Sequence, residues 1–184
     1  RQRQMCIRDR AWTNPSGGGF SDASNWNPAL SPGASDDLVL ELAGNYPVLL
    51  SGPSSANSLL VQDGEPVLSG TGKLTLESLG EGTCGPALSV QKGARLSLTD
   101  AEGALSVSAR TVLVGATEGA EQSALNLFGA TLEAPTSLSI ARNGSLVSGD
   151  ALSGGSISPG LLLTPKGVIG QGSPAPVDGF VLPL

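Results

Sequence analysis

The amino-acid sequence predicts an all-β protein, a right-handed parallel β-helix (β-solenoid) in a single domain, and two observations lead to this prediction. From Asp37 onward, apolar and polar residues alternate with a period of two, which is the pattern of strands with one buried face. These strands recur as similar strand–turn–strand units, which is typical of solenoids. Short strands separated by frequent turns also fit an antiparallel β-sandwich, which is the alternative.

The alternating runs divide the side chains of the expected strands into an inner and an outer set. The side chains expected in the core are Leu76, Leu88, Val90, Leu96, Leu98, Leu105, Val107, Leu125, Leu127, Leu138 and Ile140. The side chains expected to face water are Ser89, Ser97, Ser106, Asn126 and Ser139. Aromatic residues make up only 3% of the chain, so the predicted core is narrow and aliphatic.

Three segments share one design, in which two short strands flank a turn that contains glycine. These segments are residues 87–99, 124–135 and 137–149. Their turn glycines, Gly93, Gly129 and Gly144, are expected to have a positive φ. The repeats predict a solenoid over residues 38–165, with about five or six turns of roughly 20–25 residues. Residues 166–184 are then expected to form an irregular tail rich in Gly and Pro.

Residues 11–37 are expected to cap the N-terminal end of the solenoid, because an open sheet edge would pair with other chains. This segment contains the run GGGFSDASNW and three of the six aromatic residues, Trp12, Phe20 and Trp26. Bulky rings at this position can cover the end of the apolar core. We therefore interpret the run as part of a lid. Carbohydrate contact by Trp12 and Trp26 is the alternative, and it requires exposed rings.

The residue types of the chain give little support for a metal site or a catalytic site. Calcium prefers carboxylate and carbonyl oxygens, and the weak candidates are Asp22, Asn25, Asp36 and Asp37. We expect these side chains to cap turns or begin strands instead, so no cofactor is predicted. The chain has no histidine, and Cys84 therefore has no histidine base beside it. The carboxylates considered for glycoside cleavage are isolated in turns: Asp63, Asp100, Asp150 and Asp178. The sequence predicts no enzymatic activity.

The first ten residues, RQRQMCIRDR, resemble a translated sequencing-adapter scar, and we expect them to be foreign or disordered. They hold four of the ten basic and one of the sixteen acidic residues. The other residues then carry six basic and fifteen acidic side chains, a net charge of −9. Such a surface repels nucleic acid and anionic membranes. The scar and the apolar end GFVLPL together predict that the chain is a piece of a longer protein.

Two stretches carry a resemblance to a known group of proteins. Residues 12–40, WTNPSGGGFSDASNWNPALSPGASDDLVL, and the repeats in 111–149 resemble bacterial secreted and surface β-helix proteins of the autotransporter-passenger and filamentous-haemagglutinin types. The resemblance implies a noncatalytic, adhesin-like stalk segment, secreted or at the cell surface, with glycans or other surface proteins as partners. A carbohydrate-binding or polysaccharide-degrading β-helix is the alternative.

Overall fold

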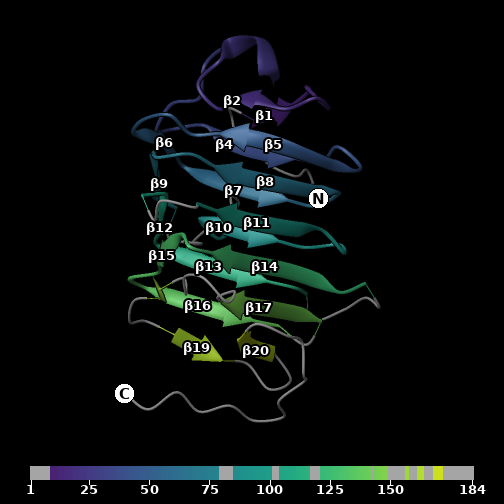
Figure 1. Ribbon diagram of the computed structural model, residues 1–184, viewed down its shortest axis with the longest axis vertical. Helices are drawn as coiled ribbons and strands as arrows, with labels where there is room; N and C mark the ends of the chain where they lie inside the picture. Colours follow the sequence, from purple (N-terminus) through teal and green to yellow (C-terminus); the bar gives the residue numbers. More distant parts are fainter. Residues whose placement is uncertain are drawn as a thin grey trace, which may run out of the picture.

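The computed structural model of the protein describes residues 9–78, 85–100, 104–116, 121–141, 143–148, 156–157, 161–163 and 168–171. These residues form three β-sheets and no α-helix. Figure 1 shows the strands stacked along the longest axis of the molecule, with the purple N-terminal segment at one end and β19 and β20 at the other. The all-β prediction is confirmed.

Each sheet collects strands that are far apart in the sequence. The first sheet contains β1 (Asp9–Trp12), β3 (Trp26–Asn27), β4 (Asp37–Leu40), β7 (Ser58–Val61), β10 (Leu88–Val90), β13 (Thr111–Val114), β16 (Ser137–Ile140) and β19 (Leu161–Leu163). The second contains β2 (Gly18–Gly19), β5 (Asn45–Leu49), β8 (Glu65–Ser69), β11 (Arg95–Thr99), β14 (Ser123–Phe128), β17 (Gly144–Ser148) and β20 (Val168–Gln171). The third contains β6 (Ser54–Ala56), β9 (Lys73–Leu76), β12 (Ser106–Ala109), β15 (Thr131–Glu133) and β18 (Ser156–Ile157).

Three successive strands, one in each sheet, form a repeating unit that we call a rung. The rungs of the described residues begin at β4, β7, β10, β13 and β16, and β19 and β20 continue the stack. Successive strands of a sheet are parallel and in register, so inner side chains form columns. One column consists of Leu38, Leu59, Leu88, Val112 and Leu138. These positions are 21, 29, 24 and 26 residues apart, a wider range than the predicted repeat length.

The strands of successive rungs pair in parallel, which rules out the antiparallel sandwich. They are parallel because the chain returns to the same sheet, in the same direction, once in every rung. The one antiparallel strand pair in the described residues joins β1 to β3 at the N-terminal end. All eleven side chains predicted to face the core are buried. The outer set contains one error, because Ser89 is only 3% exposed. Its strand partners on the two sides, Leu60 and Leu113, flank it on the outer face and exclude water.

Two predicted boundaries and one predicted turn differ in the structure. Asp9 and Arg10 belong to β1, which pairs with β4, so the last two residues of the segment predicted to be foreign or disordered are part of a sheet. Residues 1–8 lie outside the described residues. At the other end, β20 pairs with β17 inside the predicted irregular tail. Gly93 and Gly129 have the expected positive φ, but Gly144 does not, and its role is close packing between rungs.

Candidate functional site

The three aromatic residues that the sequence analysis singled out, and three of the four calcium candidates, lie at the N-terminal end, in a segment that we call the cap (residues 9–36). Its first strand, β1, adds a parallel strand to β4, with Arg10 opposite Leu38. The strand β3 then covers the outer edge of β1 in the antiparallel sense, with Trp12 opposite Trp26. In the sequence, β2 and a short 3-10 helix, η1 (Ala23–Asn25), lie between β1 and β3. The first sheet therefore ends in a strand of reversed direction.

Aromatic rings fill the interior of the cap. Trp12 and Phe20 each meet Trp26 edge to face, with ring centroids 5.1 and 5.5 Å apart. Trp12 also stacks on Tyr46 of β5 at 6.4 Å, which joins the cap to the first rung. The two indole N–H groups donate to the carbonyls of Asn14 and Phe20, both at 2.7 Å. Favourable ring geometry and satisfied donors both stabilise this arrangement.

The burial of these rings answers the question of lid or binding site. Trp12 is 1% exposed, and Phe20 and Trp26 are 2% exposed. Stacking on a sugar requires a ring face open to solvent, and neither tryptophan has one in this structure. The rings are buried, as the prediction that they cover the end of the core requires. The alternative of carbohydrate contact by Trp12 and Trp26 finds no exposed surface here.

Close packing explains two glycines of the run at residues 17–19, Gly17 against the first rung and Gly18 against Asn25 of the cap. A Cβ atom on Gly17 would lie 2.3 Å from the Pro47 carbonyl oxygen, and its φ is +81°. A Cβ atom on Gly18 would lie 2.6 Å from Nδ2 of Asn25. Only glycine allows both approaches. Gly18 and Gly19 form β2, which pairs with β5, so the run also holds the cap on the first rung.

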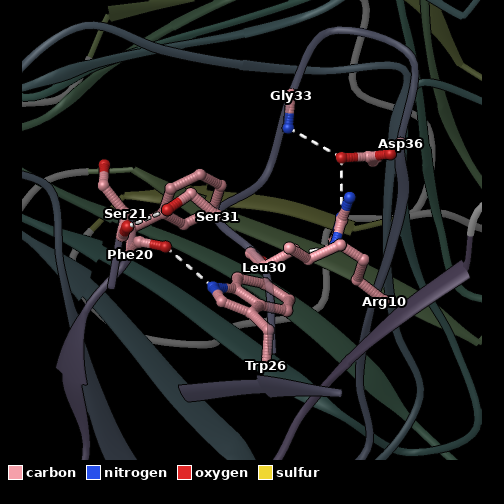
Figure 2. A network of polar contacts seen from close by, with 8 residues as sticks. All are labelled: Arg10, Phe20, Ser21, Trp26, Leu30, Ser31, Gly33 and Asp36. Carbon is pink, nitrogen blue, oxygen red and sulfur yellow. Dashed lines mark hydrogen bonds and ion pairs between the residues drawn. The ribbon is translucent and has the colours of Figure 1, made fainter. Parts of the chain in front are cut away.

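An ion pair and several hydrogen bonds, which we call the clasp, hold the loop over residues 28–36 at the end of the cap. Figure 2 shows the groups that form these bonds. The Arg10 guanidinium forms an ion pair with Asp36, with Nε 2.6 Å from Oδ2. The same oxygen accepts a hydrogen bond from the Gly33 amide at 2.8 Å. Arg10 also donates to the Leu30 carbonyl at 3.3 Å, and the Ser31 hydroxyl donates to the Ser21 carbonyl at 2.7 Å. These bonds hold the loop against the rest of the cap.

The calcium candidates bind protein donors separately. Asp22 caps η1, and the hydrogen bonds that it accepts from the amide and hydroxyl of Ser24 lower its pKa. The amide oxygen of Asn25 accepts from Asn14 at 2.8 Å, and its nitrogen donates to the Gly19 carbonyl at 2.8 Å. The part of the chain that the structure describes contains no group of three or more acidic, cysteine or histidine side chains placed to hold a metal ion.

The remaining acidic candidates also have structural partners where the structure describes them. Asp37, the fourth calcium candidate, accepts hydrogen bonds from Asn57 and Ser58 at 2.7 and 2.5 Å. Asp63 is exposed and accepts from the Gly64 amide at 2.7 Å. Asp100 is buried and accepts from the Leu105 amide. Asp150, Asp178 and Cys84 lie outside the described residues.

Sequence reasoning missed two residues of the cap region. The partnership of Arg10 and Asp36 spans 26 residues and has no local pattern, and Arg10 was assigned to the foreign segment. Tyr46 had a usable signal, because it occupies an inner position of the alternating run NYPVL in β5. It is fully buried against Trp12.

Comparisons of the chain with protein families, with curated proteins and with solved structures found no match. Among the described residues, no helix has the length and apolar character that crossing a membrane requires.

Proposed function

We propose that the chain is a right-handed parallel β-helix that serves as a noncatalytic stalk or adhesin-like segment of a secreted bacterial cell-surface protein. One observation carries this proposal: every rung lies in register on the one before it and contributes a strand to the same three sheets. Such a stack grows along a single axis, and its contacts are between neighbouring rungs. Length is the property that this construction provides.

The dimensions follow from strand spacing. Adjacent strands in a sheet lie about 4.8 Å apart, so the seven parallel strands from β1 to β19 span about 29 Å. Each further rung would add the same increment without changing the cross-section. A protein built in this way is suited to hold a binding element away from the surface that anchors it.

The side chains of the cap support a structural role. The aromatic rings are buried, and the acidic candidates in the described residues accept hydrogen bonds from turns and neighbouring strands. Glycoside cleavage needs two carboxyl groups that face each other across a substrate. Broad, weak contact with glycans or with other surface proteins needs only an extended polar face, which the outer Ser, Thr and Asn residues supply.

The test is a panel of polysaccharides screened with the purified chain for both binding and product release. We expect no product release from any polymer. Asp63→Asn removes the charge of an exposed carboxylate. Product release that is lost in Asp63→Asn, while the circular dichroism spectrum is unchanged, would overturn the noncatalytic assignment. Small-angle scattering should give an elongated particle, and an isotropic particle would contradict the stalk.

A further inference from the structure

Asn143 and Gly144 form the one Asn-Gly pair of the sequence, at the corner where the chain turns from the first sheet into β17 of the second. This pair carries a chemistry that the stalk proposal does not use. The side-chain amide of an asparagine is an electrophile, and the backbone nitrogen of the next residue can attack it by closing a five-membered ring. Glycine in the second position hinders this attack least, because it has no side chain.

In the folded structure, hydrogen bonds occupy both groups that would react. The Asn143 side-chain oxygen accepts a hydrogen bond from the Ala116 amide, and the side-chain nitrogen donates one to the Glu121 carbonyl at 2.7 Å. The Gly144 amide, which is the attacking group, donates to the Ala141 carbonyl at 2.9 Å. Ring closure removes the proton of the Gly144 amide and makes the side-chain carbon of Asn143 tetrahedral. It therefore cannot proceed while these bonds are kept.

The same corner has no room for the products of the reaction. A Cβ atom on Gly144 would lie 2.1 Å from the Val114 carbonyl oxygen, and a Cβ atom on Gly115 would lie 2.4 Å from the Gly144 nitrogen. One product, isoaspartate, adds a methylene group to the backbone at this point. Both products, aspartate and isoaspartate, replace the amide by a carboxylate, which has no proton to donate to the Glu121 carbonyl. A chain that has reacted therefore cannot restore the packing and the hydrogen bonds of this corner.

We propose that Asn143 and Gly144 form a deamidation site, which the folded stack keeps closed and which prevents the corner from closing again once it has reacted in an opened chain. The Gly144 nitrogen loses its proton to a base in the solvent and bonds to Cγ of Asn143, and Nδ2 leaves as ammonia. Water then opens the cyclic imide at either carbonyl to give aspartate or isoaspartate. The proposal does not depend on the stalk function.

The test holds the full chain at mildly alkaline pH, folded or unfolded in guanidinium chloride, and follows deamidation of the peptide that contains residues 143 and 144 by mass spectrometry. Deamidation should be at least about tenfold slower in the folded chain, because both side-chain hydrogen bonds of Asn143 must open first. Gly115→Ala should speed deamidation of the folded chain about fivefold or more, because the methyl group pushes the Gly144 nitrogen away. Gly52→Ala is the matched control and should leave the rate unchanged, because a Cβ atom there meets no other atom within 4 Å.

A refolding experiment then tests whether the reacted corner can close. Chains deamidated at Asn143 in guanidinium chloride are returned to buffer, and we expect them not to recover the original thermal unfolding transition. Wild-type chain that is exposed to the denaturant only briefly is the control, and it should recover the transition.

Three results would overturn the proposal. The first is deamidation at equal rates in the folded and the unfolded chain. The second is deamidation of folded Gly115→Ala at the rate of Gly52→Ala. The third is full recovery of the original transition by the deamidated chain. The first result is read from the wild-type chain alone, so it decides the proposal even if Gly115→Ala does not fold.

Discussion

Tyr46 marks the point where the cap meets the first rung. Its ring is fully buried and stacks on Trp12, and no group among the described residues hydrogen-bonds to its hydroxyl. Burial raises the pKa of Tyr46 to about 12, and the charges of Asp63 and Glu41 act in the same direction. The nearby Leu42 backbone lowers the pKa, although its geometry falls short of a hydrogen bond. The native state therefore favours the neutral phenol.

The predicted consequence is a loss of stability at high pH. Below pH 10, both the native and the unfolded chain keep the phenol proton. Between about pH 10 and pH 12 the unfolded chain releases it and the native chain retains it, so stability falls as the pH rises, by about 2 to 3 kcal/mol in total. Tyr46 is the one tyrosine of the sequence, so tyrosinate absorbance reports it alone.

A native protein that forms tyrosinate near pH 10 would contradict the account of Tyr46. Tyr46→Phe is the matched variant. It removes a buried hydroxyl that has no hydrogen-bond partner among the described residues, so stability at neutral pH should be unchanged or higher. The part of the pH dependence that belongs to Tyr46 should disappear.

At a corner, the chain turns from one sheet to the next. Glycines at some corners let successive rungs approach closely. Gly144 begins β17, and a Cβ atom there would lie 2.1 Å from the Val114 carbonyl oxygen. Its neighbour across the rungs is Gly115, where a Cβ atom would lie 2.4 Å from the Gly144 nitrogen. Two glycines in contact thus set the spacing between the corners after β13 and before β17.

Gly144→Ala should lower the free energy of unfolding by about 2 to 3 kcal/mol, because the backbone of Val114 must move to admit the methyl group. Gly52→Ala is the control. A Cβ atom at Gly52 meets no other atom within 4 Å, and the expected change is within about 0.5 kcal/mol. Thermal and urea unfolding of both variants measure the difference. Equal effects of the two substitutions would show that corner spacing does not limit stability.

The sequence predicted the inner side chains well because a period of two specifies which face of a strand is buried, whatever its partner. Leu96 and Leu125 are examples, and both are fully buried. The same period does not distinguish parallel from antiparallel pairing, so only the strand pairing in the structure excludes the antiparallel sandwich. Ser89 was misplaced because its burial depends on Leu60 and Leu113, which come from other rungs. The clasp between Arg10 and Asp36 likewise depends on contacts distant in sequence.

The whole molecule is a stack in which successive rungs have equivalent positions. Leu60 pairs with Ser89 in register, so these two residues occupy the same place in successive rungs. Removing residues 61–89, which are 29 residues, joins Leu60 to Val90 and takes out one complete rung. Removing residues 62–76 is a smaller deletion, but it takes β8 and β9 out of one rung and leaves β7 in place. In a stack, the larger deletion should do less damage than the smaller one.

The most direct test of the central claim compares these two deletions by circular dichroism, thermal unfolding and small-angle scattering. The chain that lacks residues 61–89 should keep its β spectrum and a cooperative transition, and should be shorter by one strand spacing, about 4.8 Å. The chain that lacks residues 62–76 should lose the cooperative transition. An unfolded protein after the whole-rung deletion, or equal tolerance of both deletions, would contradict the description of the protein as a stack of in-register rungs.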